Sequence, residues 1–321
     1  MKRWQKILGL SIFLLLILLA GPFLVPVTPG GEATERALAD PDSKFVAING
    51  LTVHYKEMGR GAQVFILLHG FGASAFSWHA VMEPLSQMGR VIAYDRPAFG
   101  LTSRPMPGEW KGESPYSVEA NVELLAGLLD TLGIEKATLI GNSAGGGVAV
   151  AFALEYPQRV VALILADPAI GNGGSRFPAW LMPLLATPQA RHLGPLLVRK
   201  MAQSGNDTIR LAWHDPSKVT GETIAGYRKP LRAFNWDAAL YEFTIASRSA
   251  GLANRLAELN MPVLVITGDD DRIVPTQASI DLAGKIPGAV LKIIPACGHV
   301  PHEEKPAEFM QIVQDFTNGL K

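Results

Sequence analysis

The stretch from Gly141 to Gly146 constrains the fold of this chain more than any other. It reads Gly-Asn-Ser-Ala-Gly-Gly, and it separates an apolar run typical of a buried strand at 137–141 from one typical of a helix at 144–156. Serine with glycine two residues before and two after, between a strand and a helix, is the G-x-S-x-G pattern of a tight, strained turn. Glycine is required at both positions because a side chain would collide with the neighbouring turn. We therefore expect Ser143 to present its hydroxyl at a helix N-terminus, where backbone N–H groups favour a developing negative charge.

A second motif follows the apolar strand expected at 64–68. His69–Gly72 reads His-Gly-Phe-Gly and matches the H-G-x-G loop that supplies a backbone donor to an oxyanion hole. The sequence therefore predicts an oxyanion hole formed by the N–H groups of Phe71 and Ala144.

Two further strands lead into ionisable side chains. The strand expected at 262–267 runs toward Asp271, and the strand expected at 289–294 runs toward His299. Together with Ser143 these residues occur along the chain in the order Ser, Asp, His. This is the order found in hydrolases whose nucleophile lies on such a strand-to-helix turn, the nucleophile elbow.

Strands and helices alternate along most of the chain, which favours a mostly parallel sheet with helices on both faces. An antiparallel pair joined at Asn49-Gly50 is expected to precede this alternation. The expected strands are 45–48, 51–58, 64–68, 90–94, 137–141, 160–166, 262–267 and 289–294, and the expected helices are 74–88, 117–132, 144–156, 276–286 and 304–319.

These motifs, in this order, resemble the serine-nucleophile, esterase- and lipase-like members of the α/β-hydrolase fold family. The resemblance runs from about Phe45 to Leu320, apart from an insertion in the middle. Tyr94–Ser103 resembles the family's D-x-x-G-x-G-x-S loop, with Ala98 in place of the first glycine, and Gly298–Glu303 resembles its G-H-x-x-x-x-E segment. The resemblance implies an α/β-hydrolase fold with an inserted helical cap, and an active site at the carboxyl ends of the strands.

The predicted catalytic residues are Ser143, His299 and Asp271. A serine hydroxyl is a poor nucleophile and needs a base within hydrogen-bond reach. His299 suits that role because its side chain titrates near neutrality and can return the proton to the leaving group. Asp271, which the resemblance favours as the acid, would fix the histidine tautomer and stabilise the imidazolium.

Each of these choices has an alternative. Asp167 follows the strand at 160–166 and occupies the other place where members of the family carry the acid, and Asp269 and Asp270 adjoin Asp271. His302 is an alternative base, whereas His69 is expected to form local hydrogen bonds that shape the oxyanion loop. The remaining histidines are expected at the surface or in the cap: His54, His79, His192 and His214.

A serine at the elbow excludes the epoxide hydrolases and haloalkane dehalogenases of this fold, which use aspartate there. The main prediction is a carboxylic-ester hydrolase that acts on small or lipid-like acyl substrates through an acyl-enzyme. The alternatives are a carbon–carbon bond hydrolase of diketone-type acids, a cofactor-free perhydrolase, and a non-catalytic ligand receptor on the same fold. We expect no cofactor and no metal, because no His/Cys/Asp cluster has convincing ligand spacing.

The N-terminus predicts a membrane anchor. Residues 1–6 are basic, and residues 7–27 are uncharged and nearly all apolar, which matches the roughly 20 residues that cross a bilayer. The alternative is a cleaved signal peptide, since 7–20 fits its apolar region, although Leu18 is too large for the position three residues before an obvious cut after Ala20. The flanking charges predict a cytoplasmic N-terminus and an extracytoplasmic catalytic domain.

We expect a linker at 28–42, hydrolase core at 43–168 and 260–321, and a helical cap at 169–259. Lys and Arg together number 29, as do Asp and Glu, so no basic footprint for nucleic acid is present. The single cysteine, Cys297, cannot form an internal disulfide. The sequence leaves the oligomeric state open.

Overall fold

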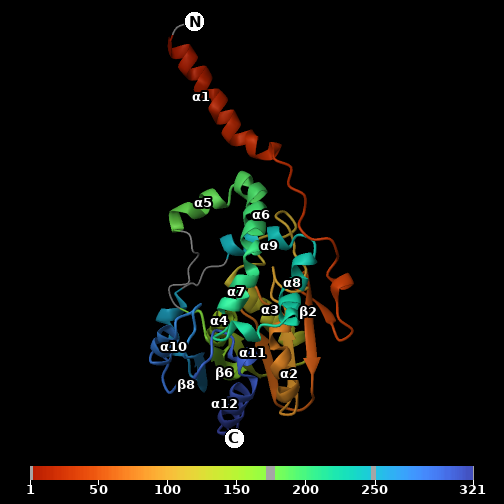
Figure 1. Cartoon of the computed structure of the whole chain (residues 1–321), viewed down its shortest axis with the longest axis vertical. Coiled ribbons are helices and arrows are strands. Elements are labelled where there is room, and N and C mark those ends of the chain that lie inside the picture. Colours follow the sequence, from red (N-terminus) through yellow and green to blue (C-terminus); the bar gives the residue numbers. More distant parts are fainter. Residues whose placement is uncertain (1–2, 171–177, 247–250, 321) are drawn as a thin grey trace.

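An eight-stranded sheet forms the centre of the computed structural model, which describes residues 3–170, 178–246 and 251–320 (Figure 1). The strands lie in the order β1-β2-β4-β3-β5-β6-β7-β8, antiparallel from β1 to β4 and parallel from there to β8. The fold and the antiparallel pair at its start are as predicted. The strands are β1 (Lys44–Ile48), β2 (Leu51–Met58), β3 (Val64–Leu68), β4 (Arg90–Tyr94), β5 (Ala137–Asn142), β6 (Val160–Ala166), β7 (Val263–Gly268) and β8 (Val290–Ile294).

Helices cover both faces of the sheet, which explains why its inner strands are apolar along their whole length. Successive side chains of a strand point to opposite faces, so that Ile66 and Leu68 join one hydrophobic core while Phe65 and Leu67 join the other. The core helices are α2 (His79–Ser86), α3 (Val118–Thr131), α4 (Ala144–Glu155), α10 (Thr276–Ala283), α11 (Pro301–Glu304) and α12 (Pro306–Asn318), with short 3-10 segments η3 (Ala75–Trp78) and η4 (Pro157–Arg159).

Two of the helices expected from the sequence are divided in the structure. The segment expected at 74–88 is a 3-10 turn followed by α2. The segment expected at 304–319 is interrupted at Lys305, whose φ of −134° and ψ of 55° lie outside the helical region. Pro306 explains this break, because a proline disfavours the helical conformation of the residue before it.

The described part of the insertion between β6 and β7 is helical. Its two longest helices, α6 (Pro188–Gln203) and α9 (Trp236–Ala246), pack together through the apolar cluster that Val198, Tyr241 and Ile245 share with Met182. Gly194 permits this approach, because an added Cβ would lie 2.3 Å from the Tyr241 ring. The segments are η5 (Ala179–Leu181), α5 (Met182–Leu185), α6 (Pro188–Gln203), α7 (Gly205–Leu211), η6 (Pro216–Lys218), α8 (Gly221–Arg228), η7 (Lys229–Arg232), α9 (Trp236–Ala246), η8 (Leu252–Asn254) and η9 (Leu256–Glu258).

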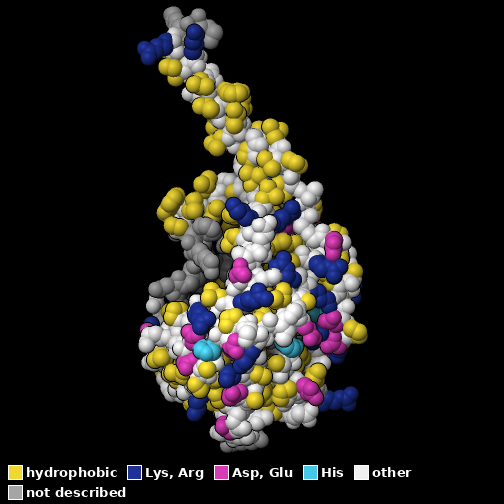
Figure 2. All heavy atoms as spheres, in the orientation of Figure 1, with side chains coloured by type: hydrophobic (Ala, Val, Ile, Leu, Met, Phe, Trp, Pro, Cys, Tyr) yellow, Lys and Arg dark blue, Asp and Glu magenta, His cyan; other side chains and the backbone are white. Residues whose placement is uncertain are grey.

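The N-terminal apolar segment is a helix that projects away from the rest of the molecule (Figure 1). Helix α1 (Arg3–Ala20) continues into η1 (Gly21–Leu24), and none of its described side chains is buried. Figure 2 shows apolar side chains along its length. The helix begins earlier than the predicted span at 7–27, and its α-helical part ends at Ala20, immediately before Gly21 and Pro22.

The segment expected as a linker at 28–42 contacts the cap. The N–H of Gly30 donates to Asp237 Oδ1 at 3.2 Å, and the N–H of Glu32 donates to the carbonyl of Arg232 at 2.8 Å. It also contains a 3-10 turn, η2 (Arg36–Leu38), whose Leu38 is buried. This segment therefore lies along the cap, with defined contacts.

Candidate active site

The turn after β5 has the strained backbone that its sequence pattern predicts. Ser143 has a φ of 51° and a ψ of −121°, unusual for a residue other than glycine. A Cβ at Gly145 would lie 2.1 Å from the carbonyl oxygen of Leu68, and one at Gly141 would lie 2.7 Å from the Gly146 backbone. Both glycines are therefore required for close packing, and the strain places Ser143 at the N-terminus of α4.

Asp271 and His299 form a buried hydrogen-bonded pair. His299 Nδ1 lies 2.7 Å from Asp271 Oδ2, while Asp271 Oδ1 accepts hydrogen bonds from the N–H groups of Ile273 and Val274 at 2.8 and 2.9 Å. Of the three neighbouring aspartates, Asp271 is therefore the one that contacts the imidazole.

The two rival aspartates of this loop make other contacts. Asp269 accepts from the N–H of Cys297, and Asp270 lies 2.8 Å from the imidazole of His214 and also pairs with Arg272. Neither is placed to orient His299.

The loop that carries His299 is held by the cap and by a buried glutamate. The N–H of His299 donates to the carbonyl of Ala212 at 2.6 Å, and a Cβ at Gly298 would lie 2.4 Å from that same oxygen. Glu304 accepts from the N–H groups of Gly298, His214 and Asp215. Glycine before the histidine is therefore explained by the close approach of the cap backbone.

Asn142 joins the Ser143 turn to the His299 loop. Its Nδ2 donates to the carbonyl of His299 at 3.1 Å and to that of Ala166 at 3.2 Å. Ser143, Asp271 and His299 are all buried, with 8%, 7% and 6% of their surface exposed. Among the described residues no hydrogen bond joins the Ser143 hydroxyl to His299, so that contact stays a prediction; such bonds often tighten only with substrate present.

The loop after β3 approaches the serine as an oxyanion loop would. A Cβ at Gly70 would lie 3.2 Å from the Ser143 Cβ and 2.9 Å from Asn142 Oδ1, so only glycine fits there without displacement. In the described part of the chain, the N–H groups of Phe71 and Ala144 donate to no protein acceptor outside the regular helix bonds. Both are therefore available to a ligand.

His69 and Arg96 hold this loop from behind. The N–H of Arg96 donates to His69 Nε2 at 3.1 Å, so the proton of the neutral ring lies on Nδ1, which donates to the Gly70 carbonyl at 2.8 Å. Burial, together with the nearby Arg96 charge, lowers the pKa of His69 to about 3. The Arg96 guanidinium also donates to the Gly70 carbonyl, at 3.3 Å. His69 thus has the local structural role expected of it.

Three phenylalanines form an aromatic cluster between the oxyanion loop and the cap. The ring centroids of Phe99 and Phe243 lie 4.8 Å apart. The centroid of the Phe71 ring lies 5.7 Å from that of Phe99 and 5.9 Å from that of Phe243. Phe71 remains 56% exposed. Local sequence patterns do not indicate this cluster, because its members are far apart in the chain and come from different segments.

His302, the alternative base, is buried beside Trp78, and its Nε2 lies 3.8 Å from Glu303 Oε1, beyond hydrogen-bond distance. Its side chain is fully buried, its ring lies 4.2 Å from that of Trp78, and burial lowers its pKa to about 3. Neither ring nitrogen has a hydrogen-bond partner among the described residues. These surroundings favour a structural role for His302.

A second Ser–His–Asp arrangement lies at the same edge of the sheet, beside β2 and the carboxyl end of β4. His54 Nδ1 lies 2.6 Å from Asp95 Oδ2, and His54 Nε2 lies 2.8 Å from the hydroxyl of Ser43. The expectation that His54 lies at the surface or in the cap is wrong, because only 3% of its surface is exposed. Asp95 also accepts from the N–H groups of Ala75 and Leu101, both at 2.6 Å.

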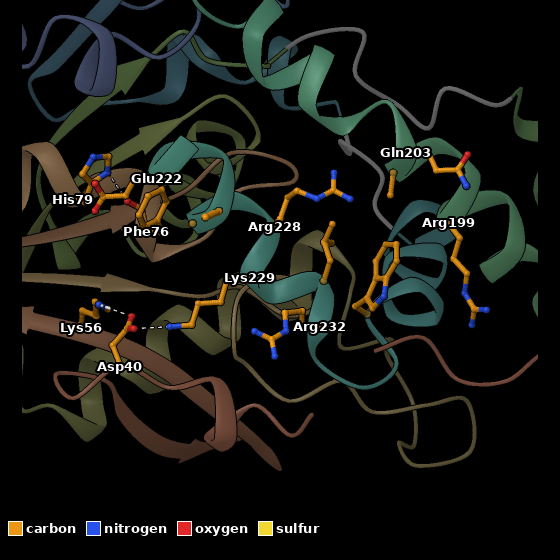
Figure 3. Close-up of a pocket in the computed structure, with 15 residues that line it drawn as sticks. Asp40, Lys56, Phe76, His79, Arg199, Gln203, Glu222, Arg228, Lys229 and Arg232 are labelled. Carbon is orange, nitrogen blue, oxygen red and sulfur yellow. Dashed lines mark hydrogen bonds and ion pairs between the residues drawn. The ribbon is translucent and has the colours of Figure 1, made fainter. Parts of the chain in front are cut away.

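A cavity of about 920 Å³ lies between the cap, the segment at 28–42 and the core (Figure 3). Asp40 binds both Lys56 and Lys229 at its edge. Ser143, Asp271 and His299 do not line it. This cavity is therefore separate from the candidate active site.

The chain belongs to the α/β-hydrolase fold family, since residues 63–306 match the model of that family. It is 34% identical over 296 residues to a 2-hydroxy-6-oxononadienedioate/2-hydroxy-6-oxononatrienedioate hydrolase of Comamonas testosteroni, covering 86% of this chain and 97% of the relative. It is 33% identical over 312 residues to a 2-hydroxy-6-oxo-6-phenylhexa-2,4-dienoate hydrolase of the same species, covering 91% and 99%.

Solved structures give a similar result. A meta-cleavage product hydrolase from Pseudomonas fluorescens superposes with a TM-score of 0.67 at 28% identity, covering 87% of this chain and 98% of that one. A membrane phospholipase A superposes with a TM-score of 0.67 at 25% identity and covers 100% of this chain and 99% of that one.

The curated relatives contradict the main functional prediction of a carboxylic-ester hydrolase and agree better with its alternative, a hydrolase of diketone-type acids. The error has a chemical reason. A strained serine, a histidine–aspartate pair and an oxyanion loop serve attack on any carbonyl, so these motifs specify the catalytic apparatus and leave the bond that breaks undetermined.

Proposed function

We propose that this enzyme hydrolyses a carbon–carbon bond in diketone-type acids of the 2-hydroxy-6-oxo-dienoate class. The similarity to two curated hydrolases of this class, each covering more than 85% of this chain, is the observation that carries the proposal. The aromatic cluster of Phe71, Phe99 and Phe243 supports it, because these rings offer an apolar surface beside the oxyanion loop for the part of the substrate that flanks the ketone.

In the proposed mechanism Ser143 attacks the ketone carbonyl while His299 takes its proton, with Asp271 stabilising the imidazolium. The N–H groups of Phe71 and Ala144 bind the oxyanion. Before this attack the proton of the 2-hydroxyl group moves to C5 of the substrate, which becomes a 2,6-diketone. The C5–C6 bond then breaks, and its electron pair passes through the C3–C4 double bond to the 2-keto oxygen as a dienolate, which receives the proton from His299. Water, deprotonated by His299, releases the acyl group from Ser143.

The reaction can be tested with the full chain in detergent and synthetic 2-hydroxy-6-oxo-6-phenylhexa-2,4-dienoate. We expect loss of the dienoate absorbance with release of equimolar benzoate, and no release by Ser143→Ala. A protein that is labelled at Ser143 by a fluorophosphonate yet releases no benzoate would contradict the proposed bond. Binding of the dienoate with neither labelling nor turnover would identify a ligand receptor instead.

We further propose that the N-terminal helix anchors the enzyme in a membrane. The segment Arg3–Leu24 has a mean hydropathy of 2.7 and is long enough to cross a bilayer. Its base contacts the cap, where Gln189 donates to the Leu19 carbonyl at 3.1 Å and His192 Nε2 lies 2.9 Å from the Val25 carbonyl. The similarity to a membrane phospholipase A along the entire chain also supports an uncleaved segment.

In this arrangement the N-terminus is cytoplasmic, and the hydrolase core (43–168 and 260–321) with its cap (169–259) is extracytoplasmic. We expect the protein to resist carbonate extraction with an intact N-terminus, and its catalytic domain to be cleaved by protease added outside the membrane. A soluble, shortened protein would instead indicate a cleaved signal peptide.

A further inference from the structure

A second buried carboxyl group lies beside the Asp271–His299 pair. Asp167 follows β6, the strand next to that of Ser143, and has a φ of 45°, so two residues other than glycine adopt left-handed backbone at adjacent strand ends. Its side chain is fully buried. Asp167 Oδ1 accepts from the Thr267 hydroxyl at 2.7 Å and from the Gly268 N–H at 3.2 Å. Within the described residues Asp167 Oδ2 has no hydrogen-bond partner.

The surroundings of the two carboxyl groups differ. One side-chain oxygen or nitrogen of each of Asp167, Asp271 and His299 lies within 4.8 Å of the others, and all three residues are buried. Asp271 accepts hydrogen bonds at both oxygens, from His299 and from two backbone N–H groups. Asp167 accepts them at only one. Two carboxylates this close and shielded from water cannot both remain ionised. The one that accepts more hydrogen bonds, Asp271, keeps the charge.

We propose that Asp167 is protonated on Oδ2 and donates a hydrogen bond to the Asp271 carboxylate, so that the acid of this site is a two-carboxyl unit that shares one proton. The proposal rests on the proposed role of the Asp271–His299 pair. It assigns Asp167 as a positioning residue, which acts through Asp271 without contacting the substrate. From the sequence alone Asp167 and Asp271 are alternatives for the acid, whereas in the structure they lie together.

The electrostatics agree with this assignment. Burial, reinforced by the negative charge of Asp271, raises the pKa of Asp167 well above its ordinary value. The other titratable groups nearby are His299 and Cys297, and burial raises the pKa of the Cys297 thiol, which stays neutral. The proton on Asp167 therefore lets the unit carry the single negative charge that His299 requires.

The proton on Asp167 can be detected from the pH dependence of the unfolding free energy, a measurement that does not depend on the substrate of the enzyme. In the unfolded chain Asp167 ionises near its ordinary pKa of 3.8, whereas in the folded protein it keeps its proton. The wild type therefore loses stability as pH rises above that value until the folded carboxyl also ionises, and Asp167→Asn removes this loss. The ratio of the two unfolding constants should change by about tenfold per pH unit in that window.

The control is Asp269→Asn, which neutralises an exposed aspartate of the Asp271 loop; its unfolding constant should keep a fixed ratio to that of the wild type. The infrared spectrum of the wild type should also contain a protonated-carboxyl band that Asp167→Asn lacks. The proposal would be overturned if the ratio of the Asp167→Asn and wild-type unfolding constants did not change with pH and the two proteins had the same infrared bands. That result would show that Asp167 is ionised in the folded protein.

The positioning role has its own measurement, the rate of Ser143 labelling by a fluorophosphonate. Glycine tolerates the φ of Asp167 and supplies no donor, so Asp167→Gly should slow labelling by about 10-fold, the value of one hydrogen bond to a charged group. Asp167→Asn keeps a donor and should recover most of that loss. Equal rates for the two variants would refute positioning, even if the pH-dependent stability confirms the shared proton.

Discussion

The described residues include two Ser–His–Asp sets, and of these the set with Ser143 has the surroundings expected of a catalytic site. In the set of Ser43, His54 and Asp95, the serine–histidine and the histidine–aspartate hydrogen bonds are both formed. In the set of Ser143, His299 and Asp271 only the histidine–aspartate bond is formed. Hydrogen bonding alone would therefore select Ser43 in place of the predicted nucleophile, Ser143.

The surroundings of the two serines reverse that choice. Ser143 has a strained backbone at the N-terminus of α4, beside a glycine loop with unoccupied N–H groups. Ser43 precedes β1, has no positive φ, and its hydroxyl accepts from the N–H of Asp40. Catalysis requires donors already aimed at the developing charge, so the comparison teaches that the backbone, more than the triad distances, marks the active site.

The largest expected difference concerns the two histidines. Replacing His299 by alanine removes the only base proposed for Ser143, and the rate of dienoate hydrolysis should fall on the order of 10⁶-fold. His54→Ala should change that rate by far less, once the fraction of folded protein is corrected for. Steady-state kinetics on both variants makes the comparison, and equal losses would remove the distinction between the sets.

The oxyanion loop provides the next test. In Gly70→Ala the added methyl group would lie 2.9 Å from Asn142 Oδ1, so the loop must move away from Ser143. Misplacing one oxyanion donor should lower kcat by about 100- to 1000-fold. Gly72→Ala is a control with no atom within 4 Å of the added methyl group, although its φ of 72° adds strain. A wild-type kcat in Gly70→Ala would argue against an oxyanion site here.

Asp95 is expected to contribute to folding stability, whereas Asp271 is expected to contribute to catalysis. Burial alone would raise the pKa of Asp95, but the charge and hydrogen bond of His54, with smaller contributions from His69 and the Ala75 N–H, lower it overall. Breaking this buried network by Asp95→Asn should cost about 3–5 kcal/mol of unfolding free energy. Because the pKa is lowered on folding, that advantage is present at neutral pH and declines below the ordinary value of 3.8. Urea unfolding of both proteins between neutral and acid pH measures it.

Ser43→Ala is expected to have the smallest effect. The variant loses two partly buried hydrogen bonds, one with His54 and one from the N–H of Asp40, which should lower the unfolding free energy by about 2 kcal/mol. Hydrolysis per folded molecule should match the wild type. A large loss of activity with normal stability would reveal that this set takes part in the chemistry.

Local patterns in the sequence predicted the fold and the positions of its strands along the chain, because apolar runs are typical of buried strands and glycines mark the tight turns between elements. The same patterns placed Asp271 and His299 after neighbouring strands, where they do meet. The burial of His54 was missed, since it depends on the loop after β4, whose Thr102 accepts from the His54 N–H. The approach of Asp167 to Asp271 likewise depends on how β6 and β7 pair. Such contacts join distant segments and leave no local signal.

The bond that is cleaved could not be predicted for a different reason. Ser143, His299 and the oxyanion loop would perform the same first step on an ester or a ketone, and the aromatic side chains proposed to contact the substrate come from both the cap and the core. Phe71 and Phe243, for example, meet only in the folded chain. Such contacts leave no local pattern in the sequence from which the cleaved bond could be predicted.

Covalent labelling followed by peptide mass spectrometry tests the central claim most directly. When the full chain reacts with a fluorophosphonate, the adduct should be found on Ser143, should be lost in Ser143→Ala, and should persist in Ser43→Ala. An adduct on Ser43, or a folded protein that is not labelled at all, would contradict the assignment of the active site.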